Sequence, residues 1–188
     1  MAVPSHSLVK SQERRGVDAK IFREEIVPAG QPVILRGLVA DWPVVQRGKG
    51  SPMATCEYLM QFHQGATVPL VLGDPTALRH LFYGPDMARF NFVRRPASLL
   101  DCLRLLISEV DNSEAPAIYI DAQPLPDCLP GFTATHAIPM LDAAVVPNIW
   151  IGNAVKVQTH FDLKSNIACI VSGRRRFTVF PPDQLPNL

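Results

Sequence analysis

The stretch VKVQTHFDLKSNIACIVSGRRRFTVFPPDQ, residues 155–184, decides which fold the chain is expected to adopt. It contains a histidine and an aspartate two positions apart, three consecutive arginines and a double proline. Its β-branched and aromatic runs, interrupted by Ser-Gly, predict strands joined by a hairpin turn. Side chains two apart in a strand point to the same face, so His160 and Asp162 are expected to project side by side. An imidazole nitrogen and a carboxylate oxygen placed in this way can bind one metal ion.

The residues around this pair extend the pattern. A Trp-Ile-Gly strand precedes the pair, and an asparagine, a turn of glycine and three arginines, and a Phe-Pro-Pro follow it. These elements are Trp150–Gly152, Asn166, Gly173–Arg176 and Phe180–Pro182. The segment resembles the JmjC-type, cupin-like branch of the Fe(II)/2-oxoglutarate-dependent oxygenases. The stretch PVILRGLVADWPVV, residues 32–45, is similar to the entry strand of that family.

The resemblance implies a mostly β fold with flanking helices, the double-stranded β-helix of cupins, also called a jelly roll. We expect the jelly roll to be incomplete in this chain, because such a fold needs about eight strands and the C-terminal part offers half of them. Residues 1–30 are expected to be an N-terminal lead-in. Residues 31–188 would be the N-terminal and central part of one cupin-like JmjC domain.

The resemblance also implies roles for individual residues. His160 and Asp162 would be the first two iron ligands, and the amide of Asn166 would lie near the co-substrate 2-oxoglutarate. Arg175 would pair with the distal carboxylate of 2-oxoglutarate, for which a bidentate guanidinium is chemically suited. Tyr119 would place its hydroxyl on the same carboxylate, although a tyrosine packed in the core fits its sequence equally well.

The sequence departs from the family pattern at two points. Val157 stands where relatives carry a threonine or serine that hydrogen-bonds the co-substrate. The second iron histidine of the family follows the His-x-Asp pair by many tens of residues, whereas the other histidines here all precede it: His6, His63, His80 and His136. We expect ordinary loop positions for the last three and therefore expect the chain to be a fragment.

The reaction implied by the resemblance is Fe(II)- and 2-oxoglutarate-dependent hydroxylation of a C–H bond. The substrate would be a protein side chain, a modified nucleotide or a small molecule, and the sequence does not select among them. The alternative is a non-catalytic cupin-like scaffold, or an inactive fragment, that acts only as a binding or interaction module. In that case His160 and Asp162 would be a hydrogen-bonded pair on a strand.

Charge and cysteine content limit the partners and the cellular environment that the sequence predicts. The formal net charge of the 188 residues is +1, which gives no electrostatic argument for nucleic acid or an anionic membrane. Cys56, Cys102, Cys128 and Cys169 form no CxxC pair and no zinc spacing, so reduced thiols and a cytoplasmic location are expected. No window approaches 18 uninterrupted apolar residues. Unpaired strand edges would favour a homodimer.

The remaining chain predicts both helices and strands. Helices are expected over 51–65, with Pro52 in the first turn, and over 96–116, with Ser98 and Asp101 as a capping-box-like start. Residues 122–147 are expected to be a long connection. Strands are expected at 33–35, 68–73, 117–121, 148–152, 154–162, 166–173 and 176–182.

Overall fold

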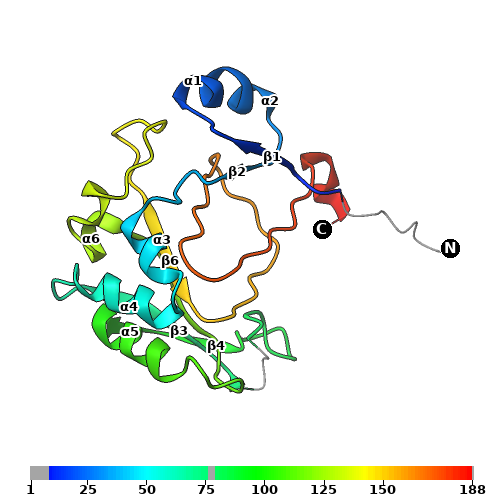
Figure 1. Ribbon diagram of the computed structural model, residues 1–188. Coiled ribbons are helices and arrows are strands. Elements are labelled where there is room, and N and C mark those ends of the chain that lie inside the picture. Colours follow the sequence, from blue (N-terminus) through cyan, green and yellow to red (C-terminus); the bar gives the residue numbers. More distant parts are fainter. Residues whose placement is uncertain (1–8, 76–78, 188) are drawn as a thin grey trace.

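The computed structural model describes residues 9–75 and 79–187, and its central element is a four-stranded antiparallel sheet in the order β4-β3-β5-β6 (Figure 1). Three of the four strands were predicted. The strands are β3 Thr67–Gly73, β4 Phe92–Ser98, β5 Ile118–Pro124 and β6 Asn148–Gly152.

One face of the sheet, here called the helix face, packs against helices and forms the core. The side chains of Val68, Leu70, Ile118 and Ile120 on this face are at most 3% exposed. The helices that cover them are α3 Pro43–Gly48, α4 Pro52–Met60 and α5 Leu99–Ser108. Because each fully buried aliphatic side chain contributes about 1.5–3 kcal/mol, this face is the main source of stability.

The opposite face, here called the polar face, carries Arg94, Tyr119, Asp121 and Trp150. Strand alternation places them there, because Arg94 and Tyr119 both pair with Val71, and Asp121 follows Tyr119 by two residues. Figure 1 shows the extended segment 153–181, drawn in orange and red, on this side of the sheet. The sheet therefore separates the apolar core from a face on which polar groups surround the buried side chain of Val71.

The helix ends show where the sequence was informative. Ser51 caps α4 by accepting a hydrogen bond from the Ala54 N–H at 3.1 Å, and Pro52 occupies the first turn as predicted. Ser98 is the N-cap residue of α5 and Asp101 lies in the first turn, as predicted, but the Ser98 side chain makes no capping hydrogen bond. Ser98 is also the last residue of β4, and the first helical N–H, that of Leu99, donates to the Ala66 carbonyl at 3.0 Å.

Within the described residues, the N-terminal part forms strands and short helical segments. Strand β1 Gln12–Arg15 pairs in parallel with β2 Val33–Arg36, and Arg36 forms an ion pair with Glu13 at 2.6 Å. Three short helical segments connect the two strands: α1 Ala19–Ile21, the π-helical η1 Phe22–Ile26 and α2 Val27–Ala29.

The connection between β5 and β6 also contains structure that was not predicted. It holds the short helices α6 Leu125–Cys128 and η3 Phe132–Ala134. It also holds His136, which lies in a loop as predicted but is buried, at 4% exposure. The neutral imidazole accepts the Val44 N–H at 3.3 Å through Nε2 and lies 2.6 Å from the Phe132 carbonyl through Nδ1. This histidine joins the connection to the start of α3.

The segment 153–181 differs most from the prediction. Of the strands expected at 154–162, 166–173 and 176–182, the structure forms none, and a single bridge pairs Lys156 with His80. A strand needs a neighbouring ladder to satisfy its backbone groups, and beyond this bridge no described segment pairs with residues 153–181 in a ladder. Asn153 follows the end of β6. Its side-chain oxygen accepts a hydrogen bond from the Ile118 N–H at 3.0 Å, and its side-chain nitrogen donates one to the Pro116 carbonyl at 2.7 Å. The 3₁₀ helix η4 Pro182–Asn187 follows the segment.

Among the described residues, no helix has the length and apolar character needed to cross a membrane.

Candidate functional site

The His-x-Asp pair lies in the extended segment after β6. His160 Nε2 is 3.9 Å from Asp162 Oδ1, and the two side chains are 61% and 59% exposed. His160 Nδ1 lies 2.8 Å from the Gln158 carbonyl oxygen, which can only accept a hydrogen bond. In the neutral imidazole Nδ1 therefore carries the proton, and Nε2 is the nitrogen with the lone pair for a metal ion. Adjacent ligand atoms on one octahedral ion are about 3 Å apart. A small movement of either side chain would therefore allow both to bind the same ion.

Asn166 is held against this pair rather than at a separate location. Its Nδ2 donates a hydrogen bond of 2.6 Å to Asp162 Oδ2, which leaves Oδ1 as the oxygen that faces His160. A hydrogen bond to the second oxygen of a carboxylate fixes the orientation of a metal ligand. In the structure Asn166 thus orients Asp162, and its predicted role beside 2-oxoglutarate stays a prediction.

Gln158 links the pair to a distant part of the chain and was not anticipated from the sequence. Its carbonyl contacts His160, and its side-chain amide contacts His80 Nε2. The neighbouring residue, Lys156, forms the bridge with His80. The link has no sequence signature, because the residues that form it are 78 positions apart.

The second part of the candidate site lies on the polar face of the sheet. The Arg175 guanidinium acts on the Tyr119 phenol by lowering its pKa. The Arg175 guanidinium carbon is 5.7 Å from the centroid of the Phe177 ring. Burial raises the pKa of the Tyr119 phenol, the charge of Asp121 raises it further, and Arg175 opposes both. A tyrosine with a raised pKa keeps its proton at neutral pH and can donate it to an anion.

Gly152, the glycine of the Trp-Ile-Gly sequence, makes room for this tyrosine. A Cβ atom at Gly152 would lie 2.7 Å from the Ile118 carbonyl oxygen and 3.0 Å from Tyr119 Cδ2. The residue pairs directly with Tyr119 in the sheet. The close approach of β5 and the ring to β6 explains why this strand ends in glycine.

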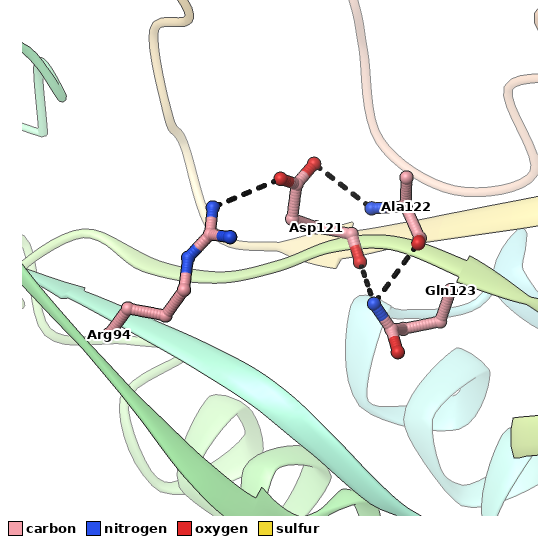
Figure 2. A network of polar contacts seen from close by, with 4 residues as sticks. All are labelled: Arg94, Asp121, Ala122 and Gln123. Carbon is pink, nitrogen blue, oxygen red and sulfur yellow. Dashed lines mark hydrogen bonds and ion pairs between the residues drawn. The ribbon is translucent and has the colours of Figure 1, made fainter.

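A salt bridge that was not predicted lies next to Tyr119. Figure 2 shows Arg94 reaching from β4 to Asp121 on β5, with Nη2 3.2 Å from Oδ2. The other carboxylate oxygen accepts the Ala122 N–H at 3.0 Å, and the Gln123 amide donates to the Asp121 carbonyl at 2.6 Å. Arg94 could not be anticipated as a site residue, because its strand was not predicted.

The donors of the His-x-Asp pair fit a ferrous ion chemically, since one imidazole and one carboxylate are two thirds of a facial triad. The described residues contain no group of three His, Cys, Asp or Glu side chains that could hold a metal ion. His136 uses both nitrogens inside the core, and His63 accepts the Gly65 N–H. His6 lies outside the described residues.

Comparison with known proteins identifies the family of this chain. Residues 18–188 match the cupin-like domain. The chain belongs to the cupin-like domain family. It is also similar to Jumonji C domain-containing protein 5 of Drosophila melanogaster, with 26% identity over 172 residues. The alignment covers 89% of this chain and 40% of that relative, so the chain spans less than half the relative's length. The predicted family and the predicted cupin-like fold with flanking helices are confirmed.

Proposed function

We propose that this cupin-like chain carries the iron- and co-substrate-binding residues of an Fe(II)- and 2-oxoglutarate-dependent dioxygenase. The observation that supports this most directly is the His160–Asp162 pair, in which Nδ1 of the imidazole contacts a carbonyl, so that Nε2 faces Asp162, and the carboxylate is oriented by Asn166. Membership of the cupin-like family and similarity to a Jumonji C protein support the same proposal. The substrate would be a protein side chain, a modified nucleotide or a small molecule that presents a C–H bond.

Each residue has a separate task in this proposal. His160 Nε2 and Asp162 Oδ1 would hold the iron, which when bound supplies oxygen activation coupled to decarboxylation of 2-oxoglutarate. Arg175 would bind the distal carboxylate of 2-oxoglutarate through a charge-assisted pair. Tyr119 would donate its phenolic proton to the same carboxylate, which its raised pKa allows at neutral pH.

The test measures metal binding and turnover separately. Cobalt(II) bound by an imidazole and a carboxylate gives visible d–d absorption, and succinate release in the presence of Fe(II), 2-oxoglutarate and oxygen reports turnover. We expect His160→Ala and Asp162→Ala to remove both, because each deletes a ligand. Asp111→Ala, which changes an exposed loop carboxylate, is the matched control. Turnover that persists in His160→Ala would reject the proposal.

A substitution of the acid-binding arginine separates the co-substrate from the metal. Arg175→Gln should raise the 2-oxoglutarate concentration needed for half-maximal turnover while leaving the cobalt spectrum unchanged. The adjacent substitution Arg174→Gln is the control for a general change in charge. Equal effects of the two substitutions would remove Arg175 from the site.

The alternative, a non-catalytic binding scaffold, is favoured by a different observation. Phe161, Leu163 and Phe177 on the segment 153–181 are 73%, 92% and 58% exposed, which suits a surface for protein contact. Cobalt binding without succinate release would favour this second function.

We also propose a reducing, cytoplasmic environment. All four cysteines are free thiols, and burial raises the pKa of Cys56 to about 11, which keeps this thiol unreactive.

A further inference from the structure

A turn at Arg79 and His80 holds the chain at two points just before the His-x-Asp pair. The Lys156 N–H donates a hydrogen bond of 3.0 Å to the Arg79 carbonyl. Two residues later, the side-chain amide nitrogen of Gln158 contacts His80 Nε2. An amide nitrogen can only donate a hydrogen bond, so His80 Nε2 accepts it. The chain on both sides of Val157 is therefore held against this turn.

The turn is itself held by the loop that follows α5. The Arg79 guanidinium donates hydrogen bonds to the carbonyls of Asn112, Ser113 and Ala115 at 3.0, 2.8 and 2.9 Å. Arg79 also has a positive φ of 61°. A residue other than glycine keeps this conformation only where its surroundings enforce it, and such residues are frequent at functional sites.

The start of β4 holds His80 from a second direction. Asn91, which directly precedes β4, donates a hydrogen bond of 2.8 Å from Nδ2 to the His80 carbonyl, and its Oδ1 accepts the Phe82 N–H at 2.7 Å. The imidazole of His80 lies nearly parallel to the Phe82 ring, with an angle of 12° between the two planes. His80 is therefore a fixed point against which the side chain of Gln158 is held.

Gln158 carries the contact to the metal pair on its backbone. Its carbonyl oxygen lies 2.8 Å from His160 Nδ1, which in the neutral imidazole selects the tautomer with the proton on Nδ1 and the lone pair on Nε2. Nε2 is the nitrogen that lies 3.9 Å from Asp162 Oδ1. Because the His160 side chain is 61% exposed, packing does little to orient the ring, and this hydrogen bond decides how it lies.

We propose that His80 is a positioning residue for the metal pair, which holds Gln158 so that its carbonyl orients the His160 imidazole with Nε2 towards Asp162. The inference rests on the proposed function for the identity of the bound ion, Fe(II). Hydrogen bonds of this kind fix the tautomer and the ring of a metal-binding histidine, and their loss typically weakens metal binding by about 10–100-fold.

Substitutions of the contact give a specific order of cobalt(II) affinities, followed by visible absorption. His80→Ala and Gln158→Leu each remove one partner and should weaken binding on the order of tenfold, the effect of about one lost hydrogen bond. The variant that combines both should bind no more weakly than either alone, because they act through one contact. His80→Gln keeps a side-chain acceptor and should restore most of the affinity. His63→Ala is the control, because His63 hydrogen-bonds within its own turn, to the Gly65 N–H.

The tautomer of His160 gives a second readout that needs no metal. Long-range proton–nitrogen NMR spectra at about pH 8, where imidazole is neutral, show which ring nitrogen carries the proton, and the His160 signals are those lost in His160→Ala. We expect the Nδ1–H form in the wild type and in His63→Ala, and a mixture with the Nε2–H form in His80→Ala and Gln158→Leu. A role of His80 in folding alone would lower the urea midpoint and leave this tautomer unchanged.

The outcomes separate the inference from the proposed function. A His160 that keeps the Nδ1–H form in both His80→Ala and Gln158→Leu would overturn the inference. Independent effects of the two substitutions on cobalt(II) affinity, or no effect of His80→Ala, would overturn it as well. If the wild type binds no cobalt(II) while the tautomer follows the expected order, the proposed metal site is wrong and the positioning role of His80 is upheld.

Discussion

The two faces of the four-stranded sheet come from the same strands and serve different purposes. On the helix face, Val68, Leu70, Ile118 and Ile120 are nearly inaccessible to water and pack against α3, α4 and α5. On the polar face, Arg94 and Asp121 stay partly exposed and form an ion pair beside the partly buried phenol of Tyr119. Because side chains alternate along a strand, a substitution on one face can leave the other intact. Stability and ligand binding can therefore be altered separately.

The largest effect is expected in the core against the helix face. Leu103 in α5 is fully buried, and Leu103→Ala should lower the free energy of unfolding by about 2–5 kcal/mol, through lost burial and the cavity left behind. Tyr119→Phe on the polar face removes only a hydroxyl and should cost about 1 kcal/mol or less. Urea unfolding of both variants measures the contrast. Equal losses would show that the faces are not energetically distinct.

The second largest effect is expected at Gly152, because a side chain there would disturb both the packing of β5 against β6 and the Tyr119 ring on the polar face. Gly152→Ala places a methyl group 2.7 Å from the Ile118 carbonyl, so β5 and β6 must separate, at a cost of about 1–3 kcal/mol. The same methyl group pushes the Tyr119 ring and should also weaken 2-oxoglutarate binding. Gly50→Ala is the control, because its nearest contact would be at an ordinary 3.8 Å. A stable Gly152→Ala variant with full affinity would contradict the close packing of Gly152 against Ile118 and Tyr119.

The smallest effect is a dependence of stability on pH that originates beside the helix face. Cys56 in α4 has a pKa raised by burial from 9.0 to about 11. At pH values between these two limits the unfolded thiol loses its proton while the folded thiol keeps it, so stability falls as pH rises from 9 to 11. Cys56→Ala should flatten this slope in urea unfolding at pH 8, 9 and 10. An unchanged slope would assign the alkaline loss to other groups.

The predictable parts of the fold are those with local causes. β3, β5 and β6 were predicted because each is a short run of β-branched and aliphatic residues bounded by turns. β4 was missed because its sequence, FVRRPAS, carries two arginines and a proline, which an edge strand tolerates. The burial of His136 was missed because its partner Val44 is 92 residues away.

The candidate site shows the same division between local and distant causes. The adjacency of His160 and Asp162 was expected from their spacing in a strand, yet in the structure the pair lies 3.9 Å apart in an extended segment that is not a strand. The Arg94–Asp121 contact depends on the register of three strands, which composition and periodicity do not specify.

The hydrogen bonds of Asn153 have a consequence for the dynamics of the chain. They close the last ladder of the sheet at the point where the segment 153–181 departs, so unfolding of that segment does not require β5 and β6 to separate. Segments with exposed backbone and few buried contacts open at a lower free energy than the core to which they are attached. His160 and Asp162 lie on such a segment. If a metal ion binds only when the segment is ordered, its apparent affinity equals the affinity for the ordered segment multiplied by the fraction of molecules in which the segment is ordered. Metal affinity at this site therefore includes the free energy of ordering the segment, and amide hydrogen exchange of residues 157–181 would report that cost directly.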